Sequence, residues 1–301
     1  MAFDDVSAQL SGIVAITVTP FAEDGAIDEK AYGAIVDRMV EGGIGVVTPN
    51  GNTSEFYALS EQETQKAVSI TAEVVAGRAT IIAGVGHDVH TAVKAARYAD
   101  AAGASGIMIH QPVHPYVSLD GWVEYHRRIA SEVPELSVIL YVRNPRIGGA
   151  QIAQLKDACP NVVGVKYAVP DPVRFASVSR DAGYDRLVWV AGLAELSAPG
   201  YFATGATGFT SGLANVAPEI SVQMFNSLKN GEFGAAMELW EFIRPFEEMR
   251  AANESANNVS VVKEALAQLG LCRRDIRPPS HPLSEKDRAK VGDLLAMWSL
   301  K

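Results

Sequence analysis

The sequence is poor in cysteine and has no long apolar segment. Its two cysteines, Cys159 and Cys272, lie far apart in a chain of 301 residues and form neither a disulfide framework nor a metal knuckle. We expect both to be reduced thiols. No apolar run approaches the length needed to span a bilayer, and the acidic residues 1–6 lack the basic-then-apolar order of a signal peptide. The sequence therefore predicts a cytoplasmic protein without a membrane partner.

An excess of positive charge is also missing. Lys and Arg number 26 against 35 Asp and Glu, which gives a formal net charge of −9. Nucleic acids and anionic membranes are bound by clustered Lys and Arg, so we expect neither as a partner. Hydrophobic residues make up 48% of the chain and charged residues 20%, as in ordinary globular proteins. A chain of this length holds two average domains or one large α/β barrel.

Short β-rich runs alternate with amphipathic helical segments along the first 230 or so residues. The runs span residues 12–19, 44–49, 80–84, 106–110, 138–142, 162–166, 187–191 and 207–210. Helical patterns between them span residues 29–42, 61–76, 89–102 and 122–132. Strands this apolar suit a parallel sheet that helices cover on its faces.

Eight such units are the number in a (β/α)8 barrel. The alternative is a doubly wound open sheet, which usually has fewer strands and a glycine fingerprint after the first strand. Here the first strand ends in Thr19-Pro20-Phe21 instead. We therefore predict a TIM barrel over residues 1–232. No Ser/Gly-rich linker follows it, so residues 233–301 are predicted to form a three-helix extension packed on the barrel, with helices at 233–253, 259–269 and 284–300.

A lysine, Lys166, closes the apolar run 161–166. Alternation along a strand predicts that Val163 and Val165 share one face while Lys166 lies on the other. An ammonium held against apolar walls loses hydration, so its pKa falls toward neutrality. A neutral amine attacks ketones and forms a Schiff base. The alternative is a lysine that reaches from the strand end into solvent.

Polar residues concentrate at the carboxyl ends of the predicted strands, where barrel enzymes collect their catalytic groups. They are found at 48–55, 87, 110–114, 141, 143, 146, 166, 192, 195 and 210–212. This concentration favours the Schiff-base interpretation of Lys166. At the end of its strand, Tyr141 would exchange protons with a substrate held at Lys166, or it is a buried structural tyrosine.

The loop 50–55 consists of small polar residues that can turn backbone N–H groups inward. Such a concavity holds a carboxylate, with the Thr53 hydroxyl as a further donor, although a plain Asn-Gly turn has the same composition. Arg143 and Arg146 would clamp a second carboxylate or sugar hydroxyls, or they are surface charges on a loop.

Histidines suggest a metal site, but their spacing argues against one. Gln-Pro-Val separates His110 from His114, and Pro115 follows, so the two cannot share one helix face. We therefore expect no metal. Gly84-Val-Gly86 lacks the third glycine of a dinucleotide fingerprint, so this motif is no evidence for a dinucleotide cofactor, and we expect none.

Over nearly its whole length the chain resembles the class I pyruvate-aldolase superfamily of dihydrodipicolinate synthase and N-acetylneuraminate lyase. The matching motifs are Val18-Thr-Pro-Phe21, Gly51-Asn-Thr-Ser-Glu55, Tyr141, Gly164-Val-Lys166 and Gly205-Ala-Thr-Gly208 with Ser211. The resemblance implies a (β/α)8 barrel with a C-terminal helical extension, usually as a homotetramer. It also implies Schiff-base chemistry at Lys166, with Tyr141 as proton shuttle and the Thr53 loop on the 2-oxo acid carboxylate.

Two departures concern the proton relay of the synthase. Asn52 stands where the synthase has a relaying threonine, and His114 where it has a second tyrosine. Because Asn52 has no exchangeable hydroxyl, this relay is altered. Arg146 does fall at the synthase's substrate-carboxylate arginine. Residues 54–60, Tyr141-Val-Arg143 and residues 209–218 look closer to the 5-dehydro-4-deoxyglucarate dehydratase branch, although Lys166 lacks the acidic residue that follows it there.

We hypothesise a lyase that dehydrates or cleaves a 2-keto-3-deoxy sugar acid. The alternatives are condensation of pyruvate with an aldehyde, as by 4-hydroxy-tetrahydrodipicolinate synthase, and a non-catalytic 2-oxo-acid binder. Arg143, His114 and Glu195 would meet the distal hydroxyls or carboxylate of the substrate. The full set of expected binding residues is Gly51, Asn52, Thr53, His114, Arg143, Arg146, Gly192, Glu195 and Ser211.

Overall fold

Eight parallel strands close into a barrel in the computed structural model, which describes residues 2–300. Each strand pairs with the next along the chain, and the last pairs with the first. The strands are β1 (Ile13–Ile16), β2 (Val46–Thr48), β3 (Thr80–Val85), β4 (Gly106–Ile109), β5 (Ser137–Val142), β6 (Val162–Tyr167), β7 (Val188–Ala191) and β8 (Gly208–Ser211). The predicted (β/α)8 fold is confirmed.

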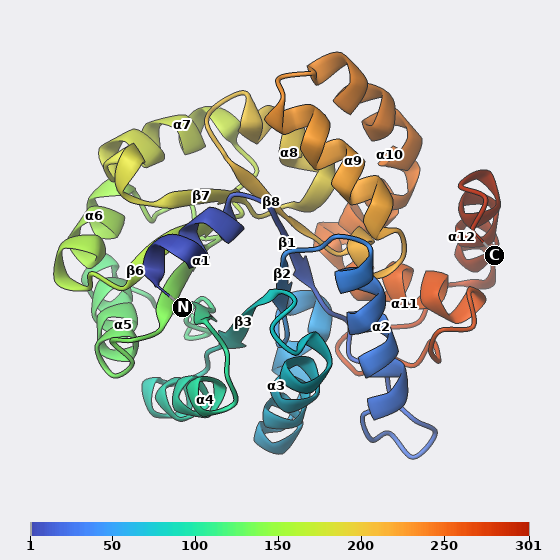
Figure 1. The fold of residues 1–301 in the computed structure, drawn as a ribbon, viewed down its shortest axis with the longest axis horizontal. Helices are drawn as coiled ribbons and strands as arrows, with labels where there is room; N and C mark the ends of the chain where they lie inside the picture. The colour runs from blue at the N-terminus through green and yellow to red at the C-terminus, as the bar shows by residue number, and fades with distance from the viewer. Residues whose placement is uncertain (1, 301) are drawn as a thin grey trace.

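Helices surround the barrel and connect its strands (Figure 1). They are α1 (Phe3–Leu10), α2 (Glu29–Glu41), α3 (Glu61–Val75), α4 (Val89–Ala101), α5 (Leu119–Ser131), α6 (Gly149–Ala158), α7 (Pro172–Asp181), α8 (Ala194–Phe202) and α9 (Pro218–Lys229). Short 3-10 helices follow β2 at η1 (Asn52–Ser54) and η2 (Phe56–Ala58), and others are η3 (Tyr184–Arg186) and η4 (Leu213–Asn215).

Capping residues explain where several helices begin. Ser60 Oγ accepts a hydrogen bond from the Glu63 amide at 3.3 Å, and Glu63 Oε2 accepts one from the Ser60 amide at 2.8 Å. These reciprocal bonds satisfy amides that a helix start leaves unpaired. At the start of α7 the Asp171 carboxylate accepts a single hydrogen bond, from the Arg174 amide at 2.8 Å. Both cap positions thus carry residue types that favour the start of a helix.

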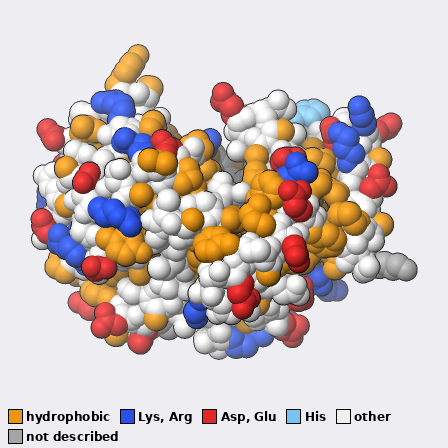
Figure 2. Space-filling model, turned by 90° about the horizontal axis from the view of Figure 1, so that it is seen from above, with side chains coloured by type: hydrophobic (Ala, Val, Ile, Leu, Met, Phe, Trp, Pro, Cys, Tyr) orange, Lys and Arg blue, Asp and Glu red, His pale blue; other side chains and the backbone are white. Residues whose placement is uncertain are grey.

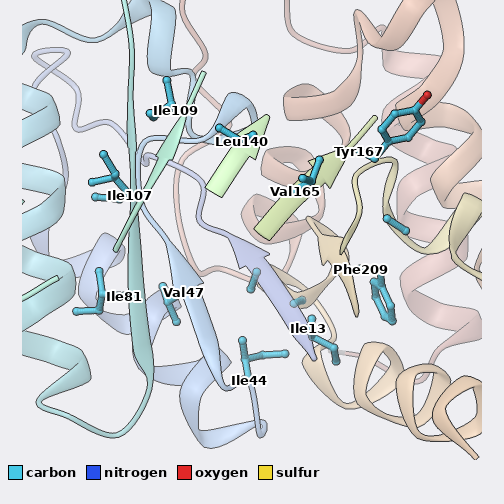
Figure 3. Packing of buried hydrophobic residues seen from close by; sticks show 14 of the residues in the cluster. Ile13, Ile44, Val47, Ile81, Ile107, Ile109, Leu140, Val165, Tyr167 and Phe209 are labelled. Atoms are coloured by element: carbon cyan, nitrogen blue, oxygen red, sulfur yellow. The ribbon is translucent and has the colours of Figure 1, made fainter. Parts of the chain in front are cut away.

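The strands bury side chains on both faces. Outward-facing residues such as Val47, Ile107 and Leu140 pack toward the surrounding helices (Figure 3). A smaller cluster, with Ile82 and Met108, fills the interior of the barrel. Each fully buried aliphatic side chain contributes about 1.5–3 kcal/mol relative to exposure. The barrel is therefore a packed core.

Helix α1 was not among the predicted elements. It packs against β6 and β7, and its Val6 and Leu10 join the interior cluster of the barrel. A Cβ built on Gly164 would lie 3.3 Å from Leu10 Cδ1, so the helix approaches β6 closely at a glycine. The helix thus covers an apolar surface that would otherwise be exposed.

The predicted alternation along β6 is wrong at Val163. Val165 packs in the outer cluster, whereas Val163 belongs to the interior cluster. The pairing of β5 with β6 advances by one residue on β5 and two on β6 at this point, which is an irregularity in the ladder. An extra residue resets the alternation, so Val163 and Lys166 both face inward.

Three helices follow the barrel, as predicted. They are α10 (Phe233–Ser255), α11 (Asn258–Gln268) and α12 (Glu285–Met297). Helix α10 packs on α8 and α9, and residues 252–254 at its end leave helical geometry. The division of the chain at residue 232 stays a prediction. Within residues 2–300, none of the helices has the length and apolarity required to cross a bilayer.

Charges of both signs are mixed on the surface. In the space-filling view, acidic and basic side chains are interspersed, and hydrophobic side chains gather near the middle of the face that it shows (Figure 2). Most ion pairs involve exposed side chains, for example Lys66 with Glu29 at 2.5 Å. Exposed pairs of this kind contribute about 0–1 kcal/mol each.

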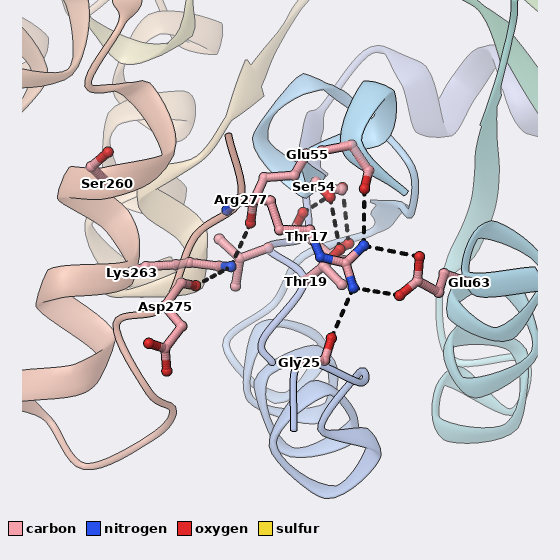
Figure 4. A network of polar contacts seen from close by, with 12 residues as sticks. Thr17, Thr19, Gly25, Ser54, Glu55, Glu63, Ser260, Lys263, Asp275 and Arg277 are labelled. Carbon is pink, nitrogen blue, oxygen red and sulfur yellow. Dashed lines mark hydrogen bonds and ion pairs between the residues drawn. The ribbon is translucent and has the colours of Figure 1, made fainter. Parts of the chain in front are cut away.

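A buried ion pair ties the extension to the barrel (Figure 4). Lys263 of α11 is fully buried and donates to Glu55, which lies between η1 and η2, and to the carbonyl of Asp275 at 2.8 Å. The other Glu55 oxygen accepts the Arg277 amide at 2.7 Å. Arg277 in turn pairs with Glu63 at 2.5 Å. The loop after β2 is therefore held from the C-terminal part of the chain.

Replacing Lys263 by methionine is expected to lower the free energy of unfolding by about 3–5 kcal/mol, because it leaves Glu55 buried without its counter-charge. Urea unfolding followed by circular dichroism measures the change. Lys66→Met removes an exposed pair and serves as the control, with an expected loss below about 1 kcal/mol. Equal losses in the two variants would contradict the prediction.

Candidate active site

A cavity of about 490 Å³ lies at the carboxyl ends of the barrel strands. Its barrel side includes Asn52, Thr53, Tyr141, Arg143, Lys166, Gly192 and Ser211. Its other side is formed by the extension, with Glu247, Arg250, Ala251, Glu254, Ser255 and Asn258. The structure therefore brings together most of the residues that the sequence singled out, and adds a wall that the sequence did not predict.

Lys166 projects into this cavity from β6. Its side chain is 6% exposed, and burial together with the nearby Arg143 guanidinium lowers its pKa to about 8. Tyr141 is its partner in the β5–β6 register, and the Lys166 Nζ lies 4.6 Å from the centroid of the tyrosine ring. A substantial fraction of this amine is therefore neutral near pH 8, and it can act as a nucleophile.

Tyr141 is held by hydrogen bonds at its hydroxyl. Asn52 Nδ2 donates to Tyr141 Oη at 3.1 Å. Burial raises the pKa of Tyr141, an effect that Arg143 partly opposes, so the phenol is neutral. Because its oxygen accepts from Asn52, its own proton is free for another acceptor. Asn52 thus orients the phenol without being able to relay a proton.

The loop after β2 is tightly constrained. A Cβ on Gly51 would lie 2.3 Å from Ile16 Cγ2, so only glycine fits there. Ser54 Oγ donates to the Thr17 carbonyl at 2.5 Å and accepts from the Gly51 amide at 3.1 Å. Thr53 is buried, lines the cavity and accepts a hydrogen bond from Asn258.

His110 supports this loop from behind. Its Nε2 donates to the Asn50 carbonyl at 2.8 Å, and Asn50 has a left-handed φ of +62°. Burial lowers the pKa of His110 to about 3, so the ring is neutral. Its ring stacks on Phe56 with the centroids 4.3 Å apart. The residue therefore holds the backbone at the start of the loop.

Glu195 lies behind the cavity wall, although it was expected to meet the substrate. It is fully buried, and its Oε1 accepts hydrogen bonds from Ser211 Oγ at 2.5 Å and Ser221 Oγ at 2.7 Å. Burial and the nearby Glu247 carboxylate raise the pKa of Glu195 to about 7, and Arg250 opposes this shift. Ser211 stands between Glu195 and the cavity.

His114 and Arg146 lie outside the cavity, contrary to expectation. Both side chains are exposed on loops that leave the barrel rim. His114 Nδ1 accepts from the Tyr116 amide at 3.1 Å, and Arg146 Nη1 donates to the Val117 carbonyl at 3.1 Å. Local contacts within and between these loops thus hold both side chains away from Lys166.

Arg250 and Asn258 are cavity residues that sequence reasoning missed. Arg250 lies 84 positions beyond Lys166 in the chain, and neither residue belongs to a motif. The available signal was indirect: Glu247 and Arg250 stand three apart in a helical pattern, where opposite charges pair. A Cβ on Gly212 would lie 2.2 Å from Arg250 Nη2, so the glycine after β8 makes room for the guanidinium.

Comparison with known proteins agrees with the fold. A model of the dihydrodipicolinate synthetase family matches residues 9–297. The chain belongs to this family. Its members include lyases and aldolases, and the relatives below carry two different names.

A protein from Rhodococcus opacus named probable 5-dehydro-4-deoxyglucarate dehydratase is 30% identical over 95% of this chain and 94% of its own length. A 4-hydroxy-tetrahydrodipicolinate synthase from Phenylobacterium zucineum is 31% identical over 95% and 96%. The solved structure of dihydrodipicolinate synthase from Bacillus clausii has a TM-score of 0.94 and 41% identity, over 98% of this chain and all of that one. The choice between these activities rests on the site.

The lowered pKa of Lys166 predicts an unusual pH profile of reactivity. Alkylation of Lys166 by formaldehyde and cyanoborohydride is expected to rise with pH and level off above about 8, because only the neutral amine reacts. An ordinary lysine, with a pKa of about 10.4, continues to gain reactivity well above that point. Peptide mapping after timed labelling gives both profiles, and a Lys166 profile that matches the exposed lysines would contradict the prediction.

Proposed function

We propose that this protein is a Schiff-base-forming lyase that acts on a 2-keto-3-deoxy sugar acid. The observation that carries the proposal is the Lys166 amine, which lines the cavity with a pKa lowered to about 8 and lies beside the Tyr141 ring. An amine in such surroundings is suited to attack a ketone, because a substantial fraction of it is neutral near pH 8 and it is shielded from water.

The chemistry begins with the C2 ketone of the substrate. Neutral Lys166 adds to it, and loss of water leaves an imine whose protonated form draws electrons toward C2. A base then removes a proton from C3, and the electron pair expels the C4 hydroxyl, which departs as water after protonation. Retro-aldol cleavage uses the same imine but breaks the C3–C4 bond. Tyr141, with its free proton, is the proposed proton shuttle.

The two ends of the substrate have distinct partners. Asn52 and the Thr53 hydroxyl, which line the cavity, bind the C1 carboxylate beside the imine, whereas Gly51, whose amide donates to Ser54 Oγ, shapes the loop that carries them. Arg143 follows the end of β5, two residues after Tyr141, and lines both the main cavity and an adjoining one of about 280 Å³. It therefore binds the distal carboxylate or hydroxyls of a longer acid. Gly192 and Ser211 line the remaining wall.

The synthase reaction is the second candidate, because several relatives carry that name. Two positions weigh against it. Asn52 supplies an amide in place of an exchangeable hydroxyl at Tyr141. Arg146, the residue that would favour it, is exposed and bonded to the Val117 carbonyl outside the cavity. We therefore prefer the sugar-acid reaction. Assembly as a homotetramer and a cytoplasmic location stay predictions.

Replacing Lys166 by alanine is expected to lower turnover of the sugar acid by at least about 10³-fold, because no other group on the cavity wall can form the imine. The assay follows the release of either a dehydrated acid or pyruvate. Lys156→Ala is the matched control: Lys156 is partly buried, its pKa is also lowered by burial, and it binds carbonyls at the start of the same strand. Its turnover should stay near that of the wild type.

Substrate choice is tested by offering pyruvate with aspartate semialdehyde in parallel with 2-keto-3-deoxy sugar acids. Consumption of the sugar acid alone supports the proposed reaction, and joint consumption of pyruvate and the aldehyde would establish the synthase instead. Retained sugar-acid turnover in Lys166→Ala would contradict the Schiff-base mechanism.

A further inference from the structure

Asn258 of α11 reaches the loop that is proposed to bind the C1 carboxylate, and Arg250 of α10 in turn binds Asn258. We infer that Asn258, held by Arg250, orients the Thr53 hydroxyl toward that carboxylate and so acts as a positioning residue for substrate binding. The inference rests on the proposed function, since it concerns the same site and the same 2-oxo acid.

The orientation of the Asn258 amide follows from its partners. Arg250 Nη2 lies 2.7 Å from one end of the amide. A guanidinium carries only donors, so the atom that faces it must be the carbonyl oxygen, Oδ1. The amide nitrogen, Nδ2, is then the atom that faces Thr53 Oγ1, at 3.3 Å. Arg250 therefore fixes which group Asn258 presents to Thr53.

The hydrogen bond that Asn258 donates to Thr53 Oγ1 directs the hydroxyl proton of Thr53 away from Asn258. A hydroxyl that accepts from Asn258 still has one proton to donate. Within the described chain, residues 2–300, no hydrogen bond is found in which Thr53 Oγ1 is the donor. Thr53 is only 5% exposed and lines the cavity. A carboxylate in the cavity is the acceptor that this buried donor lacks, and the resulting bond is charge-assisted.

Arg250 is itself held rigidly. Its Nη1 binds both Glu247 oxygens, at 2.6 and 2.9 Å, and both side chains are buried. The guanidinium lies against Gly212, where any larger residue would collide with it. Glu247 of the same helix and Gly212 of the barrel therefore fix the position of the Arg250 guanidinium that binds Asn258.

The backbone between α10 and α11 carries this pair to the loop. Asn253, Glu254 and Ser255 have φ values of +53°, +57° and +69°, a conformation that residues with a side chain rarely adopt. Glu254 and Ser255 also line the cavity. Strained backbone of this kind is commonly found at functional sites. Residues 256 and 257 complete the turn, and α11 begins at Asn258, which lines the cavity.

Trapping with two ketones tests the inference. Full-length protein is incubated with pyruvate or with its neutral methyl ester in the presence of cyanoborohydride, and the adduct on Lys166 is quantified by mass. Asn258→Ala is expected to raise the pyruvate concentration for half-maximal adduct about tenfold, because a bond to the carboxylate is weakened. The half-maximal concentration of methyl pyruvate should stay unchanged.

Two further variants separate positioning from a structural role. Asn257→Ala alters a neighbouring, partly buried asparagine without a side-chain capping bond, and it should leave both ketones unaffected. Asn258→Asp keeps the acceptor for Arg250 but presents an acceptor to Thr53, which turns the hydroxyl proton away from the cavity. It should weaken pyruvate trapping at least as much as Asn258→Ala does.

The double variant Asn258→Ala with Thr53→Val tests whether Asn258 acts through Thr53. If Asn258 acts through Thr53, then Asn258→Ala adds no further loss in the Thr53→Val background. Full additivity, an equal effect on methyl pyruvate, or unaltered pyruvate trapping in Asn258→Asp would overturn the inference while leaving the Schiff base intact. Failure of the wild type to form a Lys166 adduct with either ketone overturns the proposed function, and this inference with it.

Discussion

The burial of one amine is the constraint on which the rest of the site depends. Lys166 is 6% exposed, and desolvation lowers its pKa to about 8. Removing a charged amine from water is costly, so the surrounding site favours its neutral form. Tyr141 presents its ring to the same amine, and Asn52 fixes the phenol from the far side. The proposed nucleophile and the proposed proton donor therefore come from neighbouring strands.

The C-terminal extension completes the site. Two separate contacts from it end on the short stretch after β2: Lys263 pairs with Glu55, and Asn258 donates to Thr53. The first contact anchors the loop, and the second sets the direction of a hydroxyl within it. The barrel supplies Lys166, while the extension holds the loop that is proposed to bind the carboxylate and forms the other side of the cavity. Both parts are needed for one site.

The barrel and its lysine were predictable because their signals are local. Each strand is an apolar run, and Lys166 ends such a run, where barrel strands present side chains to a site. The ladder irregularity at Val163 could not be predicted, since it depends on the pairing of β6 with β5. Helix α1 was missed because the apolar surface on which its two buried residues pack forms only when the barrel has folded.

The residues that line the cavity were harder to predict. Asn258 and Arg250 reach the site only through the tertiary placement of α10 and α11, which no local pattern encodes. Glu195 was expected on the cavity wall, yet two serine hydroxyls hold it behind that wall. Arg146 occupies the position that the family resemblance indicates, but its loop carries it outside. Sequence position therefore locates a side chain along the barrel and leaves its direction undetermined.

Borohydride reduction of the wild-type protein with a 2-keto-3-deoxy sugar acid tests the central claim most directly. Intact mass and peptide mapping identify the modified residue and the fragment that it carries. We predict a single adduct on Lys166, whose mass shows whether water or a carbon fragment left before reduction. Absence of an adduct on folded protein, or modification spread over exposed lysines, would contradict Schiff-base chemistry at this site.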